Sequence, residues 1–217
     1  MQKSDKTPAA RRSGPARPRG RPRAFDREAA LSQATRLFWL KGYEATSITD
    51  LTEAMGIASP SLYSAFGSKE ELYAEALRYY NAKYESLIWE KFFAAKTGRE
   101  AMSALLLDSA AVLSGSIVDI PCGCMVVLSS VGNEGHQALG DLVRCARAET
   151  LDRLKTRVNQ AVAAGEIPAK VDVHALARFV QTVQSGMSIL ARDGASRAEL
   201  ESVAQVAMLG WDALAAR

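Results

Sequence analysis

Apolar residues recur at helical spacing along the chain from about residue 26 onward, and helix-capping residues stand at the ends of the periodic stretches. Asp26 is placed to begin the first helix, and Gly42 to end it after Lys41. The pattern predicts an all-α fold, with longer helices over residues 26–41, 69–93, 102–116, 136–164, 173–192 and 198–215.

A shorter pattern between residues 46 and 69 predicts two brief helices joined by a tight turn. Thr46 or Ser47 can cap the first helix, and Asp50 stands where a capping box needs its acid. Gly56 can end that helix in a left-handed conformation, which glycine adopts at little cost.

The second brief helix is expected to have Ser59 as its cap and Pro60 at its first position. Leu62 and Phe66 lie four residues apart and point inward. The arrangement matches a helix-turn-helix unit, and an ordinary helical hairpin is the alternative. The outward positions hold small or polar residues: Ser61, Ser64 and Ala65.

Further capping boxes predict where the next helices begin. Ser68 with Glu71 opens a helix that we expect to continue to Phe93, and Thr97 with Glu100 opens another. Residues 119–121 then break the chain. The apolar run 122–128 fits either a strand or a buried helix by its pattern alone, and the helical context favours a helix.

The two C-terminal helices carry apolar residues on more than one face. A helix that is apolar on two sides needs two partners. One side can pack on the rest of the chain, and the other side is a candidate homodimer face. A single monomeric core is the alternative interpretation.

Charge is unevenly distributed along the 217 residues, whose net charge is +3. Residues 1–23 hold eight basic residues and one acid, so this arm is +7 and the remainder is −4. The arm is rich in Pro, Arg and Ser and is expected to be disordered when free. Its last part, including Arg21 and Arg23, is typical of segments that follow a phosphate backbone or enter a minor groove; a solubilising tail is the alternative.

The sequence predicts a cytoplasmic protein without a membrane span or a secretory signal. Its most apolar region, residues 104–131, is interrupted by Asp108, Asp119 and Pro121. Three cysteines fit no disulfide framework and suit a reducing compartment.

Residues 46–47, 54–58 and 62–72 resemble the N-terminal domain of the TetR family of bacterial transcription regulators. Gly42, the Leu62-Tyr63 pair, Phe66 and the Lys-Glu-x-Leu run from Lys69 fall at that family's spacing, over about residues 24–80. The resemblance implies a homodimer of all-α subunits. It divides the chain into a basic arm (1–23), a DNA-binding domain (24–68) and an effector-binding and dimerisation domain (69–217).

The resemblance also assigns roles at the DNA. Thr46 and Ser47 would contact phosphate at a helix N-terminus, where free N–H groups favour anions. Tyr63 and Lys69 would hold backbone phosphates. The residues facing base edges would be Ser59, Pro60 and Ser61, with Thr49 as a weaker candidate.

Short side chains on the second helix limit how sequence can be read. The hydroxyls of Ser59, Ser61 and Ser64 cannot make the bidentate contact that arginine makes with guanine. Pro60 stands where the family often has a small residue, and it adds an apolar contact while removing a donor. We therefore expect several weak contacts, the Arg21/Arg23 arm and DNA shape to set the preference.

The larger C-terminal domain is expected to bind a small-molecule effector of unknown identity. Apolar residues that could line its cavity, although plain core is the more common role of such residues, are Trp89, Phe92, Phe93, Leu106, Met125, Met187 and Trp211.

Cys122 and Cys124 form a close pair that raises two further possibilities. They could sense oxidants or electrophiles if a thiolate is stabilised, although the apolar run around them favours inert burial. Metal binding is disfavoured because Cys145 is distant and the histidines, His136 and His174, form no second close pair.

No cofactor motif and no catalytic motif supports an enzyme, since the chain has no Gly-rich phosphate loop or nucleophile elbow. The sequence predicts a DNA-binding regulator, most simply a repressor that a small molecule releases from a palindromic operator. A thiol sensor and a non-specific nucleoid-type DNA binder are the alternatives.

Overall fold

The structure, a computed structural model, describes residues 25–132 and 135–215. Each secondary-structure element in these ranges is an α-helix, so the predicted all-α fold is confirmed. None of the described helices combines the length and apolar character needed to cross a membrane. The helices are α1 (Arg27–Lys41), α2 (Ile48–Met55), α3 (Ser59–Phe66), α4 (Lys69–Tyr84), α5 (Ser86–Ala94), α6 (Gly98–Leu113), α7 (Met125–Leu128), α8 (Gln137–Ala163), α9 (Val173–Arg192) and α10 (Arg197–Ala215).

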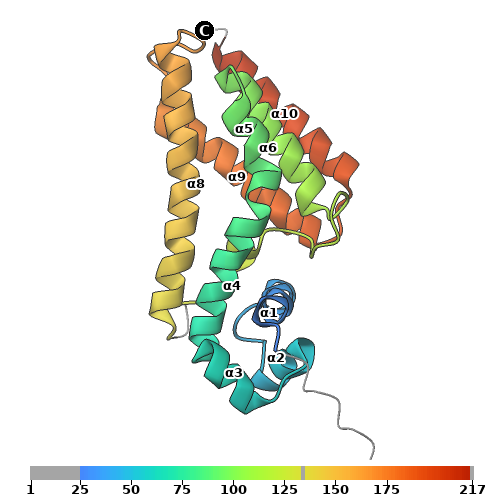
Figure 1. Ribbon diagram of the computed structural model, residues 1–217. Helices are drawn as coiled ribbons and strands as arrows, with labels where there is room; N and C mark the ends of the chain where they lie inside the picture. Colours follow the sequence, from blue (N-terminus) through green and yellow to red (C-terminus); the bar gives the residue numbers. More distant parts are fainter. Residues whose placement is uncertain (1–24, 133–134, 216–217) are drawn as a thin grey trace, which may run out of the picture.

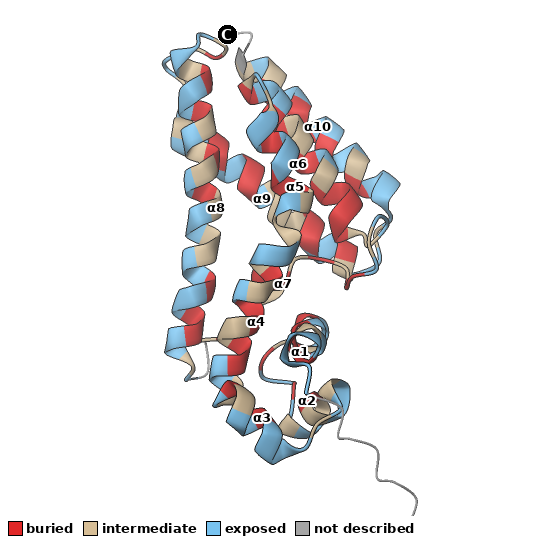
Figure 2. Cartoon of the chain, viewed as in Figure 1, coloured by how far each residue is buried: buried red, intermediate tan, exposed pale blue. Residues whose placement is uncertain are grey.

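Helices α1, α2 and α3 form one end of an elongated molecule, and α4 leads from them into the larger part (Figure 1). There α6 packs against α5 and α10, while α8 runs along one side and packs against α9. Buried residues line the inner faces from α1 to α10 (Figure 2). They form a continuous cluster, so the N-terminal helices share a core with the larger part.

Local capping signals explain most helix starts. Asp26 accepts a hydrogen bond from Ala29 N, and Ser196 forms a reciprocal box with Glu199 at the start of α10. The prediction for α3 was wrong by one residue. Its N-cap is Ala58, in extended conformation and without a side-chain bond, so Ser59 is the first helical residue and Pro60 the second.

The predicted continuous helix beyond Lys69 is divided in the structure. Helix α4 ends at Tyr84 and α5 begins at Ser86, with Glu85 between them. The backbone of Glu85 is itself helical, at φ −58° and ψ −44°, so the chain continues in nearly the same direction.

The prediction of a helix over residues 122–128 was largely wrong. Only a single turn, α7, forms at the end of this run, and residues 114–124 form a connecting segment. Gly123 explains the difference, because its φ of 80° is left-handed and incompatible with a continuing helix. Helix α6 also starts and ends earlier than predicted, at Gly98 and Leu113.

Candidate nucleic-acid interface and internal cavity

Helices α2 and α3 meet at a turn that Gly56 closes. As predicted, Gly56 is left-handed, at φ 66° and ψ 34°, and its N–H donates to carbonyls of the last turn of α2. Leu51 in α2 and Leu62 in α3 are fully buried, so the inner faces of the two helices anchor the unit. This geometry is a helix-turn-helix.

The outer face of α3 is open to solvent. Leu62 and Phe66 are buried on its inner side, whereas the predicted base-facing residues are exposed. Thr49 in α2 is exposed as well. The exposed residues of α3 that could contact DNA are Ser59, Pro60, Ser61, Tyr63 and Ser64.

Arg27 fixes the orientation of α3. Its guanidinium donates to both carboxylate oxygens of Glu75 in α4, at 2.5 and 2.7 Å, and to the Ala65 carbonyl at the end of α3. The same guanidinium lies 4.5 Å from the ring centroid of Phe66. One side chain therefore ties α1, α3 and α4 together, and no local sequence pattern predicts this role for Arg27.

The N-terminus of α2 carries the predicted capping box. Ser47 Oγ accepts from Asp50 N at 3.0 Å, and Asp50 accepts from Ser47 N and Lys41 Nζ, both at 2.9 Å. Ser47 is exposed, and its hydroxyl proton is not used in the hydrogen bonds of the described residues. Thr46 is 0% exposed and its hydroxyl donates to the Gly42 carbonyl at 2.6 Å, so the predicted phosphate contact at this position would have to be made through the backbone.

The two predicted phosphate-holding side chains differ in their surroundings. The ring of Tyr63 is 48% exposed on α3. The Lys69 ammonium lies 4.2 Å from the ring centroid of Tyr43, and partial burial lowers its pKa while nearby Glu44 opposes the shift. Arg21 and Arg23 of the basic arm lie outside the described residues.

A histidine that sequence analysis considered only as a metal ligand connects the long helix α8 to this end of the molecule. His136, the N-cap of α8, makes a 2.6 Å contact from Nδ1 to Glu70 at the start of α4. Its ring packs edge-on against Tyr43 at 4.7 Å between centroids. Burial, followed by Glu70 and Glu44, raises the pKa of Tyr43 to about 12, so its phenol stays neutral.

A second junction lies where α1 meets the segment before α7. Trp39 Nε1 donates to the Gly123 carbonyl at 3.0 Å. Arg192, at the end of α9, donates to the carbonyls of Trp39, Leu40 and Cys122 at 2.8, 3.0 and 2.9 Å. Helices α1 and α9 are therefore held to the same connecting segment.

A cavity of about 370 Å³ lies among α4, α5, α8, α9 and the segment before and within α7. Of the predicted effector-binding residues, Trp89 and Cys124 line it. Sequence analysis missed its polar wall because those residues come from two helices, α8 and α9, whose facing sides only tertiary packing brings together. The polar residues include Arg147, Thr150, Arg153, Arg178, Gln181 and Gln184.

The other predicted effector-binding residues lie elsewhere. Phe92 and Phe93 line a separate hollow of about 490 Å³ between α5 and α8. Those that belong to the packed core, at 0–3% exposure, are Leu106, Met125, Met187 and Trp211. Their burial agrees with the interpretation as plain core, because an apolar residue gives the same sequence signal in a core and in a cavity wall.

The two neighbouring cysteines have different environments. Cys124 lies on the cavity wall, where its Sγ accepts a 3.3 Å hydrogen bond from the buried Tyr80 hydroxyl. Burial raises the pKa of Tyr80 well above its usual value, which keeps this donor protonated. Cys122 lies outside the cavity lining and its thiol donates to the Ser114 carbonyl at 3.5 Å.

Comparison with known proteins agrees with this geometry. Residues 30–76 match the family model described as bacterial regulatory proteins, tetR family. The HTH-type transcriptional repressor ComR of Escherichia coli K12 is 34% identical over 199 residues, which cover 90% of this chain and 93% of ComR. The repressor BdcR of the same strain is 30% identical over 188 residues, covering 87% of this chain and 90% of BdcR.

Among solved structures, a cysteine mutant of the TetR-family regulator CifR, complexed with 26-bp double-strand operator DNA, is 38% identical. It superposes with a TM-score of 0.80 and covers 87% of this chain and 98% of CifR. The fold and the helix-turn-helix define a DNA-binding transcriptional regulator. The chain belongs to the TetR family.

Proposed function

We propose that this chain is a homodimeric repressor that leaves its operator when a small molecule fills the 370 Å³ cavity. Residues 24–68 would form the DNA-binding domain and residues 69–217 the effector-binding and dimerisation domain. The observation that carries the proposal is the cavity's position on α4, the helix that begins directly after α3 and holds it through Arg27 and Glu75.

At the DNA, the exposed face of α3 would enter the major groove. Ser59, Pro60 and Ser61 would approach base edges, with weaker help from Thr49 and Ser64. Ser47, Tyr63 and Lys69 would contact phosphates, and the Arg21/Arg23 arm would add contacts to the backbone or minor groove. Phosphate contacts position the protein, and base contacts specify the site.

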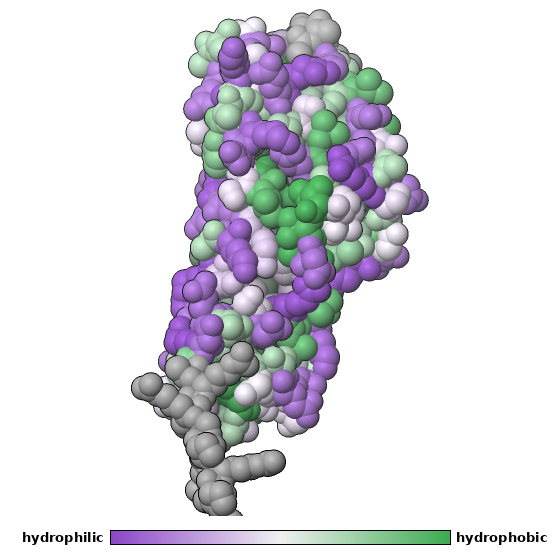
Figure 3. All heavy atoms as spheres, turned by 45° about the vertical axis from the view of Figure 1, so that its right-hand side comes forward, coloured by the Kyte–Doolittle hydropathy of each residue, from purple (hydrophilic) through white to green (hydrophobic). Residues whose placement is uncertain are grey.

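The dimer would form through α9 and α10, as part of the same proposal. Large apolar side chains remain exposed on both helices. On the side of the molecule where α6 and α10 lie, Figure 3 shows a contiguous apolar area bordered by hydrophilic groups. Contiguous exposed apolar areas often mark interfaces. The exposed side chains are Phe179, Ile189, Leu190, Val203, Val206 and Leu209.

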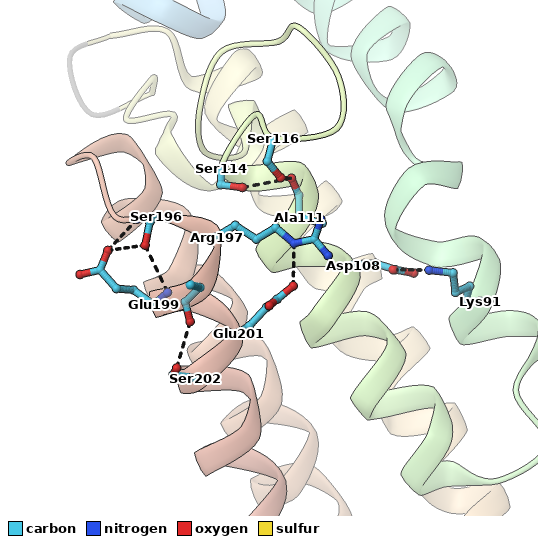
Figure 4. Close-up of polar contacts among 11 residues, drawn as sticks. Lys91, Asp108, Ala111, Ser114, Ser116, Ser196, Arg197, Glu199, Glu201 and Ser202 are labelled. Carbon is cyan, nitrogen blue, oxygen red and sulfur yellow. Dashed lines mark hydrogen bonds and ion pairs between the residues drawn. The ribbon is translucent and has the colours of Figure 1, made fainter.

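Polar side chains near the start of α10 are already engaged within that helix. Figure 4 shows Ser196 with Glu199 and Arg197 with Glu201, while α6 is tied to α5 by Lys91 and Asp108. The apolar residues further along α10 are therefore the part of this helix that we expect to contact the second subunit.

Release requires the effector to favour the subunit arrangement that cannot span both half-sites. Half-sites of helix-turn-helix dimers lie about 34 Å apart or a multiple of that distance. A change in the cavity that moves α4 would alter the spacing of the two α3 helices.

The test is selection of bound sites from random duplex DNA, followed by footprinting in excess competitor duplex. We expect protection of two symmetric half-sites that survives competition. Uniform binding that only salt weakens would instead indicate the nucleoid-type alternative.

One observation favours a second candidate, a thiol sensor: Cys124 lies on the cavity wall. Under this alternative an electrophile would modify Cys124 and release the operator. Release that persists in a Cys122→Ser/Cys124→Ser protein would rule it out.

A further inference from the structure

The cavity has an apolar side and a cationic side. Tyr84, Ile88 and Trp89, from the region where α4 meets α5, supply aromatic and aliphatic surface, and Val126 and Val127 add to it. The opposite helices, α8 and α9, contribute three arginines: Arg147, Arg153 and Arg178. Whether a carboxylate of the protein pairs with each arginine indicates which ligands the cavity can bind.

Arg153 is neutralised within the protein. Its guanidinium forms an ion pair with Glu85, which also lines the cavity, and lies 5.2 Å from the ring centroid of Trp89. An incoming anion would have to compete with Glu85 for this arginine.

Arg147 is hydrogen-bonded but not neutralised. Nε and Nη2 donate to the carbonyls of Val126, Val127 and Ser129, at 2.6–3.2 Å. Carbonyl groups satisfy N–H donors without cancelling the positive charge. Within residues 25–132 and 135–215, Arg147 forms no ion pair and its Nη1 makes no hydrogen bond.

Arg178 is in a similar state. Its Nη1 donates to Gln181 Oε1 at 2.8 Å, and the described part of the chain offers it no carboxylate partner. Gln181 is only 8% exposed, and its Nε2 donates to the Arg147 carbonyl at 2.7 Å. This buried amide fixes Arg178 beside the α8 turn that carries Arg147.

Uncompensated guanidinium groups beside an apolar wall favour an anion, because a carboxylate can take a charge-assisted hydrogen bond from each. We propose that the cavity binds a small organic monoanion, a carboxylate with an apolar or aryl body, whose charged group pairs with Arg147 and Arg178. The inference rests on the proposed function, since it names the chemical class of the effector at that site.

Glu149 disfavours a second negative charge on the ligand. This exposed carboxylate also lines the cavity and has no ion-pair partner in the part of the chain that is described. A second anionic group on the ligand would be repelled by it. The apolar wall accounts for the ligand body, because it offers burial but few donors.

The position of Arg147 links this ligand to the DNA-binding helices. Arg147 donates to the carbonyls of Val126, Val127 and Ser129, and the Gly123 carbonyl in the same connection accepts from Trp39 of α1. A carboxylate that draws the Arg147 guanidinium toward the cavity would therefore change these hydrogen bonds and shift the segment that is bonded to α1.

The experiment measures direct binding to the DNA-free, full-length protein by isothermal titration calorimetry at neutral pH. The probes are hexanoate, octanoate, decanoate and 3-phenylpropanoate, each with its neutral amide. We expect at least one acid to bind, about tenfold or more tightly than its amide, because a charge-assisted bond contributes more than a neutral one.

Arg178→Gln should weaken binding of the acid about tenfold and leave the amide unchanged, whereas Arg178→Lys should retain part of the affinity. The control is Arg144→Gln, the same substitution on α8 at an exposed residue that pairs with Asp141 outside the cavity. It should bind the acid normally. Because no DNA is present, the result does not depend on whether an operator is found.

Three results would overturn the proposal. The first is that none of the acids binds, and the second is that amides bind as tightly as acids. The third is that Arg178→Gln binds the acid as well as the parent while its thermal unfolding shows it to be folded.

Discussion

The indole nitrogen of Trp39 donates a 3.0 Å hydrogen bond to the carbonyl of Gly123, 84 positions away in the chain. The bond joins the last turn of α1 to the segment that enters the cavity wall at Cys124. Trp39 is also packed edge-on against Tyr80 of α4, at 4.7 Å between ring centroids. One side chain thus contacts α4 and the segment that helps to line the cavity.

The first prediction removes this hydrogen bond while keeping an aromatic ring. Trp39→Phe should lower the free energy of unfolding, measured in urea, because the Gly123 carbonyl loses its donor. Trp211→Phe is the control, since Trp211 is equally buried and its indole has no hydrogen bond among the described contacts. We expect Trp39→Phe to cost about 1 kcal/mol more than the control. Equal losses would show that the bond contributes nothing.

A second prediction concerns the backbone of the same segment. Gly123 has φ 80°, and a Cβ there would lie 2.7 Å from the Ser188 carbonyl oxygen and 2.5 Å from Leu128 Cδ1. Gly165 has a similar φ of 75° with no atom within 4 Å. Gly165→Ala should therefore cost only the strain of the left-handed backbone, about 1 kcal/mol.

Gly123→Ala should cost that strain and a steric clash of about 1–3 kcal/mol in addition. Urea denaturation of both variants gives the comparison. Similar midpoints for Gly123→Ala and Gly165→Ala would mean that the segment yields to the methyl group, and that α9 does not hold it firmly.

Local signals in the sequence predicted the parts of the fold that depend on neighbouring residues. Ser47 with Asp50 and Gly56 were assigned correctly, because a cap or a left-handed turn involves only residues within one helical turn. The local signal misled at Ser59, because serine is a preferred N-cap and alanine is not, yet the extended residue before α3 is Ala58, which makes no side-chain cap bond.

The site features that sequence analysis missed are long-range. Arg27, His136 and Arg192 act through partners 38 to 153 positions away, which no local pattern reveals. The cavity shows the same limit. Met187 and Leu106 are apolar, as residues of a ligand pocket often are, but they lie in the core. Gln181 and Arg178 line the cavity only because α8 and α9 pack together.

The third prediction concerns pH. Hydrogen bonds from Ser47 N and then Lys41 lower the pKa of Asp50 from 3.8 to about 2. Since the folded pKa lies below the unfolded value, the ionised carboxylate stabilises the folded state above about pH 4, and this contribution is lost as the pH falls toward 2. Asp50→Asn should be less stable than the parent at neutral pH, and the difference should shrink through this window.

Urea midpoints measured across the acid range test this prediction. Glu53→Gln is the control, because Glu53 is exposed on the same helix without an ion pair in the described region. Its difference from the parent should stay constant. A gap for Asp50→Asn that is independent of pH would exclude ionisation as the source of its effect.

The fourth prediction separates phosphate contacts from base contacts. Lys69→Gln should weaken operator binding and reduce the slope of log affinity against log salt by about 0.9, because one fewer counterion is released. Tyr63→Phe should weaken binding of all sequences without changing that slope, since a phenol carries no charge. Ser61→Ala should shift base preference in a selection experiment.

Lys83→Gln is the matched control for Lys69→Gln. Lys83 lies near the far end of α4, where its ammonium bonds to the Tyr79 hydroxyl at 2.7 Å. Its substitution should leave the salt slope unchanged. Identical slopes for the Lys69→Gln protein and the parent would remove Lys69 from the phosphate contacts.

The fifth prediction places a charge on the proposed dimer face. Val206 is 68% exposed on α10, so Val206→Glu disturbs no packing within the subunit. A carboxylate facing its symmetric copy across a two-fold interface would be buried and repelled, and the dimer should dissociate. Analytical ultracentrifugation should show a monomer. Thermal unfolding of this monomer should begin at the same temperature as that of the parent protein. Operator affinity should fall steeply, because one subunit contacts only one half-site.

The control, Leu142→Glu, alters a similarly apolar and 44% exposed residue on α8, outside that face, and should remain a dimer. If Val206→Glu is also dimeric, the interface must lie away from this part of α10.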